Sequence, residues 1–158
     1  MNTFNINQAG LDLIKKFEGF EPKKYECPAG KATIGYGHVI KKGESFTKLT
    51  EKAAEGLLAE DLRYFEDKVR ELITVPLSEN QFSALVSFTF NVGEENLKNS
   101  TLRRMLNGGD YDGASEQFMR WVKARNAEGV MITLEGLKNR RKAEKLLFES
   151  KGEYGVAA

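Results

Sequence analysis

The sequence has little cysteine and histidine, and it contains no long apolar run. Cys27 is the single cysteine, so no internal disulfide can form and a reducing compartment is adequate for folding. No stretch reaches the ~18 apolar residues that a membrane span needs. The opening segment MNTFNINQAGLDLIKK also lacks the basic-then-apolar order of a secretion signal. We therefore expect a protein that is made in the cytoplasm and has no stable membrane insertion.

An excess of charge of one sign is also missing. The chain has 24 Lys and Arg against 23 Asp and Glu, and no basic half is separated from an acidic one. This balance gives no electrostatic case for a nucleic-acid partner. A length of 158 residues with 41% hydrophobic and 30% charged residues predicts one domain with a real core, residues 1–158, ending in a short tail at 151–158.

Most of the chain shows apolar residues at helical spacing. The first such segment has Asn7 as its expected N-cap and Gly19 as its stop. The longest runs over 51–73, with Thr50 as a cap and Pro76 beyond its end. Ser78 and Gln81 resemble a capping box for a following helix that Gly93 closes, and further helices are expected at 100–106, 113–123 and 134–150.

Residues 20–46 differ from the rest, because they are rich in glycine and β-branched or aromatic residues and lack a helical period. We expect a small antiparallel sheet there, with a turn near 28–31. The whole chain is then of the α+β class, mostly helical, with one small sheet near its start.

Glu18 is the first candidate for chemistry. A carboxylate at a helix C-terminus is opposed by the helix dipole, which raises its pKa, and burial by Phe17 and Phe20 would raise it further. A glutamic acid that stays protonated near neutral pH is the proton donor that a glycosidic leaving oxygen needs. The alternative is a solvated glutamate at a helix end.

Three further residues have ordinary alternatives when each is taken alone. Cys27 fits a small buried apolar residue, and Thr33 fits a strand residue. His38, the only histidine, would be half of a zinc site with Cys27, but the sequence marks no further ligands. A histidine that hydrogen-bonds the loop around Glu18 and stabilises the hairpin is the better interpretation.

The spacing of these residues resembles a known signature. Glutamate, eight residues, cysteine, five residues, threonine and then IGYGH is similar to the catalytic motif of phage lysozymes, or endolysins, of glycoside hydrolase family 24. Further matches follow in order: ALVSFTFNVG at 84–93, STLRRMLN at 100–107, QFMRWV at 117–122 and GLKNRR at 136–141. The resemblance therefore extends from about Ile6 to Phe148.

This resemblance implies a lysozyme-like fold with two lobes. A small lobe with the β-sheet would cover about 1–50, a helical lobe would cover 74–150, and the long helix 51–73 would join them. The implied activity is hydrolysis of the β-1,4 bond between N-acetylmuramic acid and N-acetylglucosamine in bacterial peptidoglycan, for host cell lysis. No metal and no organic cofactor are implied.

The resemblance also implies catalytic roles. Glu18 would protonate the leaving oxygen, while Cys27 and Thr33 would hold a water on the opposite face of the sugar. Cys27 stands where other members have aspartate, and a thiol is mostly neutral at pH 7 unless something lowers its pKa. It would therefore position the water, act as a thiolate or attack the sugar; we favour positioning.

Other positions match residues that contact the glycan or support the site in relatives. The expected glycan contacts are Val39, Phe90, Asn91, Thr101 and Gln117. His38 and Arg140 would support the site, with Arg140 pairing with the catalytic glutamate. The alternative for Arg140 is a solvated helix face, because it lies among other basic residues, and Phe90 would alternatively belong to the core.

The resemblance finally implies a setting. Such an enzyme would act as a monomer on peptidoglycan glycan strands, after waiting in the host cytoplasm until a holin opens the way to the periplasm and cell wall. The alternative is a non-catalytic peptidoglycan-binding or structural relative of the same fold, which the cysteine at position 27 keeps open. A helical adaptor protein would leave the spacing from Glu18 to Thr33 unexplained. Action from outside through a basic C-terminal helix at 138–151 is a further hypothesis.

Overall fold

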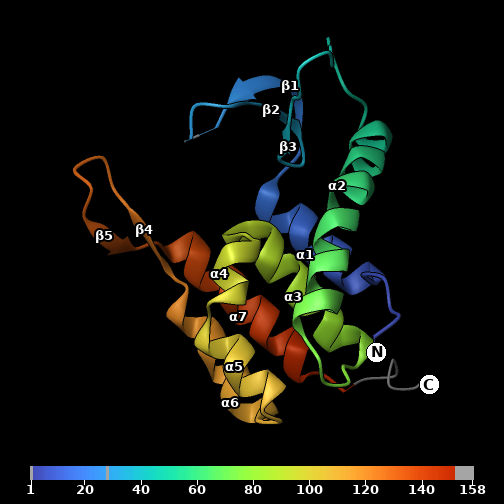
Figure 1. The fold of residues 1–158 in the computed structure, drawn as a ribbon. Coiled ribbons are helices and arrows are strands. Elements are labelled where there is room, and N and C mark those ends of the chain that lie inside the picture. The colour runs from blue at the N-terminus through green and yellow to red at the C-terminus, as the bar shows by residue number, and fades with distance from the viewer. Residues whose placement is uncertain (1, 28, 152–158) are drawn as a thin grey trace. The chain divides into compact units, whose positions relative to one another are not determined.

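The computed structural model describes residues 2–27 and 29–151, and it consists mainly of helices (Figure 1). The helices are α1 (Gln8–Glu18), α2 (Glu51–Leu72), α3 (Glu79–Val92), α4 (Glu94–Lys98), α5 (Thr101–Asn107), α6 (Tyr111–Gln117) and α7 (Glu135–Glu149), with a 3₁₀ turn at Phe118–Arg120. The strands are β1 (Glu21–Glu26), β2 (Ala32–Gly35), β3 (His38–Val39), β4 (Lys123–Arg125) and β5 (Met131–Thr133). The expected α+β, mostly helical class is confirmed. No helix in these ranges has the length and apolarity that crossing a bilayer requires.

The chain divides into two compact units. One consists of residues 14–64 and is called here the sheet unit; the other consists of the residues up to Leu13 and from Phe65 onward and is called the helical unit. Both boundaries lie inside helices, α1 and α2. This division differs from the expected lobes at 1–50 and 74–150, since most of α2 belongs with the sheet and the start of α1 belongs with the later helices.

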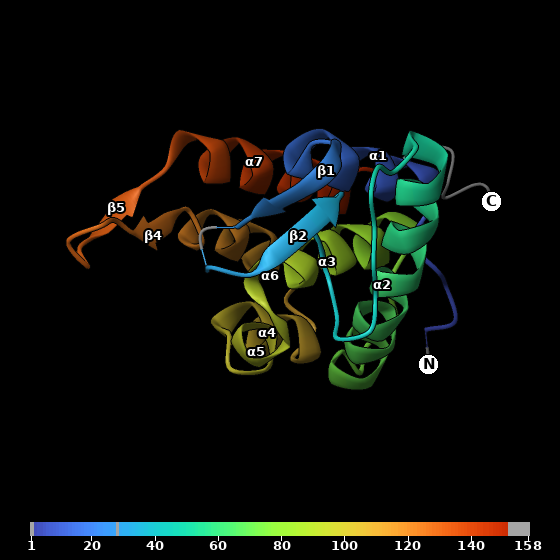
Figure 2. The same cartoon turned by 90° about the horizontal axis from the view of Figure 1, so that it is seen from above.

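The sheet unit is organised around an antiparallel sheet in the order β1-β2-β3, with β1 and β2 side by side (Figure 2). Tyr25 pairs with Thr33, and Thr33 pairs with Val39, so these three side chains share one face of the sheet. The Tyr36 hydroxyl donates to Glu51 Oε2 at 2.7 Å and thereby joins the β2–β3 turn to the start of α2. Burial together with Glu51 raises the pKa of Tyr36 to about 12.

The helical unit is built around α3, and α7 packs along it (Figure 1). Phe82, Leu85 and Phe88 on α3 are fully buried. The Phe88 ring meets Phe118 edge-on at 5.3 Å and Trp121 edge-on at 5.7 Å between centroids. These aromatic contacts hold the segment after α6 against the core of the unit.

The expected helix caps are confirmed. Asn7 Oδ1 accepts from the Gly10 N–H at 3.0 Å, and Thr50 Oγ1 accepts from the Ala53 N–H at 3.1 Å. Ser78 and Gln81 form the reciprocal capping box of α3, with bonds of 3.0 and 2.9 Å. Because each cap satisfies a backbone donor that the first turn leaves unpaired, short sequence signals were enough to place these helix starts.

Two expectations about the fold were wrong. The helix expected at 113–123 ends at Gln117, and the chain then passes through the 3₁₀ turn into β4. Residues 2–27 and 29–151 contain two sheets rather than the one expected, because β4 and β5 form a second antiparallel pair. Helix α4 had not been expected, whereas the helix expected at 51–73 is confirmed as α2, Glu51–Leu72. Of the turn expected at 28–31, Pro28 lies outside the described residues, while the Gly30 N–H donates to the Cys27 carbonyl at 2.8 Å.

Candidate functional site

Glu18 is the last residue of α1, so the end of that helix determines its position. Gly19 follows with φ +75°, and its N–H donates to the Lys15 carbonyl at 3.0 Å, which ends the helix. The half-buried carboxylate lies against Gly37 in the β2–β3 turn. A Cβ at position 37 would stand 2.9 Å from Glu18 Oε1, and Gly37 has φ +81°. Only glycine meets both conditions without strain, so the turn leaves room for the carboxylate.

Cys27 and Thr33 are in contact. Contacts with the Lys31 backbone and then with the Thr33 hydroxyl lower the pKa of the Cys27 thiol. The Thr33 side chain is 2% exposed, and its hydroxyl donates to the Lys31 carbonyl at 2.9 Å. Because a hydroxyl has one proton, it can donate to that carbonyl or to a Cys27 thiolate, but not to both. Ionisation of Cys27 would therefore favour a turn of the Thr33 hydroxyl.

Tyr25 is a residue of this region that sequence reasoning missed. Burial is the largest of the effects that raise the pKa of Tyr25, and the negative charges of Glu18, Glu21 and Cys27 raise it further. It lies across the sheet from Thr33 and is 36% exposed. Its position two residues before Cys27 on an alternating strand was the signal that could have found it.

His38 is buried between two carboxylates. Its Nδ1 lies 2.8 Å from Asp61 Oδ2 on α2, and its Nε2 lies 3.0 Å from Glu44 Oε1 in the loop after β3. Burial lowers the pKa of His38, but hydrogen bonds to Asp61 and Glu44 outweigh burial and raise it. The histidine thus ties β3 to α2 and to the next loop, which differs from the expected bond to the loop around Glu18. In the described ranges, no three or more His, Cys, Asp or Glu side chains form a group that could hold a metal ion.

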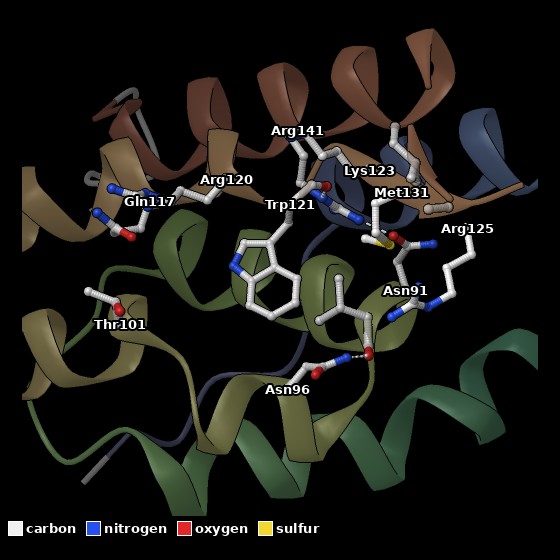
Figure 3. A pocket seen from close by; sticks show the side chains of 13 residues that line it. Asn91, Asn96, Thr101, Gln117, Arg120, Trp121, Lys123, Arg125, Met131 and Arg141 are labelled. Atoms are coloured by element: carbon white, nitrogen blue, oxygen red, sulfur yellow. Dashed lines mark hydrogen bonds between the residues drawn. The ribbon is translucent and has the colours of Figure 1, made fainter. Parts of the chain in front are cut away.

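The helical unit contains a cavity of about 730 Å³. Asn91, Thr101 and Gln117, three of the five expected glycan contacts, line it together (Figure 3). Trp121 also lines the cavity, and its ring rests on Phe88. Phe90 is half-buried and packs edge-on against Phe65, with 5.4 Å between ring centroids.

The fourth expected contact, Val39, belongs to the sheet unit. It is 44% exposed and stands directly across from Thr33. The sheet unit therefore holds Glu18, Cys27, Thr33 and Val39, and the helical unit holds the remaining expected glycan contacts.

Arg140 does not lie on a solvated helix face, and that alternative was wrong. Arg140 is 3% exposed and its neighbour Arg141 is fully buried. Arg140 Nε donates to Glu144 Oε2 at 3.1 Å, and the same arginine donates to the Ser87 carbonyl at 3.1 Å. The Glu144 carboxylate is itself fully buried and accepts from the Ser87 hydroxyl at 2.7 Å.

Arg141 was not singled out from the sequence, yet it organises one wall of the cavity. It contacts Glu144 and Asn91, and its Nε donates to the Trp121 carbonyl at 2.9 Å. Burial lowers the pKa of Arg141, opposed by Glu144. Since Asn91 and Trp121 both line the cavity, the guanidinium holds two of its lining residues in place.

Comparisons with known proteins agree over nearly the whole chain. The family model for phage lysozyme matches residues 15–144. An endolysin of Acyrthosiphon pisum secondary endosymbiont phage 1 is 44% identical over 148 residues, which cover 92% of this chain and 99% of that protein.

Solved structures give the same result. The muramidase domain of SpmX from Asticaccaulis excentricus superposes with a TM-score of 0.86 at 36% identity, covering 94% of this chain and 99% of that one. An endolysin from Escherichia coli O157:H7 phage FAHEc1 also superposes with a TM-score of 0.86, at 37% identity, covering 95% and 96%. The chain belongs to the phage lysozyme family.

Proposed function

We propose that this chain, a lysozyme-type glycoside hydrolase by its family, cleaves the β-1,4 bond between N-acetylmuramic acid and N-acetylglucosamine with Glu18 as general acid. One observation carries the proposal: Glu18 at the end of α1 and the contacting pair Cys27 and Thr33 belong to one compact unit. The absence of a side chain at Gly37 leaves room for the Glu18 carboxylate beside the β2–β3 turn.

The proposed chemistry divides between the two sides of the sugar. Protonated Glu18 donates its proton to the leaving oxygen as the glycosidic bond breaks, and an oxocarbenium-like centre develops. A water held by Cys27 and Thr33 adds to that centre. The cysteine-containing triad, and with it placement in glycoside hydrolase family 24, is part of this proposal.

Cys27 is suited to positioning the water in either protonation state. As a thiol it can donate weakly, and as a thiolate it accepts from the water. The contacts that lower its pKa increase the thiolate fraction at neutral pH. Replacement of Cys27 by Ser tests this role: near-native activity with unchanged stereochemistry excludes thiolate chemistry, whereas a trapped glycosyl-thioether from the native protein would overturn positioning.

The remaining roles follow from the resemblance. Val39, Phe90, Asn91, Thr101 and Gln117 are proposed to contact the glycan. Arg140 is proposed to support Glu18, and His38 is proposed to hold the hairpin in place through Asp61 and Glu44. The protein is proposed to act as a monomer, released from the host cytoplasm after a holin opens the inner membrane.

The experiment compares the native protein with Glu18→Gln on permeabilised Gram-negative cells. Native protein should clear the cells, and Glu18→Gln should bind their walls without clearing them. Glu21→Gln is the matched control, because Glu21 is an exposed carboxylate of β1 in the same unit, and it should clear at the native rate. If native protein and Glu18→Gln both bound walls and neither cleared them, the non-catalytic alternative would replace the proposal.

A further inference from the structure

We propose that the β4–β5 hairpin is a substrate-binding element that recognises the free carboxylates of peptidoglycan stem peptides through Lys123 and Arg125. This inference deepens the proposed function and rests on it. Neither residue was singled out from the sequence, and both line the cavity of the helical unit.

The β4–β5 hairpin buries few side chains, so packing does not account for its presence. It projects from the helices of its unit in both views (Figures 1 and 2). All three residues of β5 are exposed, and Val130 and Met131 are 55% and 49% exposed. A two-stranded ribbon exposed in this way contributes little to stability, so a binding role accounts for it better.

The register directs the cations toward the cavity. Lys123 pairs with Thr133, and Arg125 pairs with Met131. Paired residues and residues two apart share one face of a ribbon, so Lys123, Arg125 and Met131 are on the same face. All three line the cavity (Figure 3). On the opposite face, the small Ala124 also reaches the lining, whereas its partner Ile132 does not.

Hydrogen bonds in the turn and at the base of the hairpin define its backbone, although neither of its faces is packed. Asn126 Oδ1 accepts from the N–H groups of Glu128 and Val130 at 3.0 Å each, and Gly129 has φ +79°. At the base, the Leu134 N–H donates to the Val122 carbonyl at 2.9 Å. Arg125 donates to the Gly129 carbonyl at 2.8 Å, which fixes its position along the strand. The hairpin therefore presents its cations from a defined backbone.

The cavity has a positive field with nothing in its lining to cancel it. Its basic lining residues are Arg120, Lys123, Arg125 and Arg141, and no described residue of the lining is acidic. Glu144, which is not part of the lining, neutralises the charge of the buried Arg141 through an ion pair. The charges of the other three are exposed, so an anionic group is the ligand that the lining favours.

The substrate identifies the anion. The sugar rings have hydroxyl and acetamido groups, and the lactyl carboxyl group of muramic acid is an uncharged amide where a stem peptide is attached. The free carboxylates of such a strand are therefore those of its stem peptides. Arginine pairs with carboxylates in a bidentate geometry, and lysine supplies a point charge. Trp121, Val92 and Met131 provide apolar surface beside the cations for the alkyl parts of a peptide.

The test measures binding by Glu18→Gln protein to purified glycan strands with their peptides and to the same strands after their peptide carboxylates are converted to amides. The Glu18→Gln protein should bind the strands with free peptide carboxylates more tightly. Adding Lys123→Gln and Arg125→Gln should raise the Kd for those strands about three- to tenfold and leave the Kd for the amidated strands unchanged. The difference should shrink at high salt, because these cations are exposed.

The matched control is Lys98→Gln with Lys142→Gln, which removes the same charge from exposed positions of the helical unit outside the cavity lining. This pair should change neither Kd. The inference is overturned if the Glu18→Gln protein shows no preference for strands with free peptide carboxylates, if the hairpin variant keeps that preference, or if the control loses it equally. Loss of the proposed function itself would instead appear as failure of native protein to cleave either strand. Circular dichroism should show that the hairpin variant is folded. Ile132→Ala changes the opposite face of the hairpin and should keep the preference for peptide carboxylates, which separates a folding defect from lost recognition.

Discussion

Replacing Gly37 by Ala tests how the β2–β3 turn keeps the Glu18 carboxylate in place. The new Cβ would lie 2.9 Å from Glu18 Oε1, closer than real Cβ contacts, and it would sit on a backbone with φ +81°. The left-handed backbone costs about 1–2 kcal/mol for a residue with a Cβ. The carboxylate can move away, but a displacement of ~1 Å at a reacting group can reduce the rate about 100-fold.

Gly43 provides the matched control for this change. It has φ +92°, but a Cβ there would meet nothing within 4 Å, so Gly43→Ala introduces the strain without the contact. Urea denaturation should show similar losses of unfolding free energy for both variants. Peptidoglycan hydrolysis per folded molecule should fall only for Gly37→Ala. Equal activity of the two variants would refute the proposed relation between Gly37 and Glu18.

Two other predictions concern stability. Glu144→Gln removes the fully buried carboxylate that Arg140 and Arg141 share, and it should lower the free energy of unfolding by about 3–5 kcal/mol; a loss below about 1 kcal/mol in denaturant titrations would contradict this. The pKa of His38 is higher in the folded protein than its unfolded value of 6.5. The ion pairs of His38 therefore stabilise the folded state fully below pH 6.5, and this stabilisation is lost as the pH rises through the folded-state pKa. Native protein should therefore lose unfolding free energy relative to His38→Gln across that range, and parallel pH profiles of the two proteins would count against the assignment.

The sequence predicted those parts of the fold that local interactions specify. The caps at Asn7, Thr50 and Ser78 act over three residues, so the starts of α1, α2 and α3 could be placed from the sequence. The sheet at 21–39 could be recognised because its glycines and β-branched residues break the helical period.

Elements too short to show a periodic pattern were missed. Strands β4 and β5 have three residues each, too few to show an alternating pattern, and the apolar residues before Lys123 favoured a longer helix. The turn residues Asn126 and Gly129 were the available signal.

In the candidate site, too, some residues could be found from the sequence and others could not. The spacing of Glu18, Cys27 and Thr33 was visible in the sequence, and the structure groups them in one unit. Arg141 could not be told from its basic neighbours, because its burial depends on Glu144 and on Asn91, 50 residues away. Buried arginines on a basic helix look solvated until the tertiary structure supplies their partners.

The most direct test of the central claim identifies the sugar ends that the protein releases from purified peptidoglycan. Borohydride reduction followed by mass spectrometry should find new N-acetylmuramic acid reducing ends with native protein and with Glu21→Gln. Glu18→Gln should release none above background. New N-acetylglucosamine reducing ends, or undiminished release by Glu18→Gln, would contradict the assignment of Glu18 as the general acid of a muramidase.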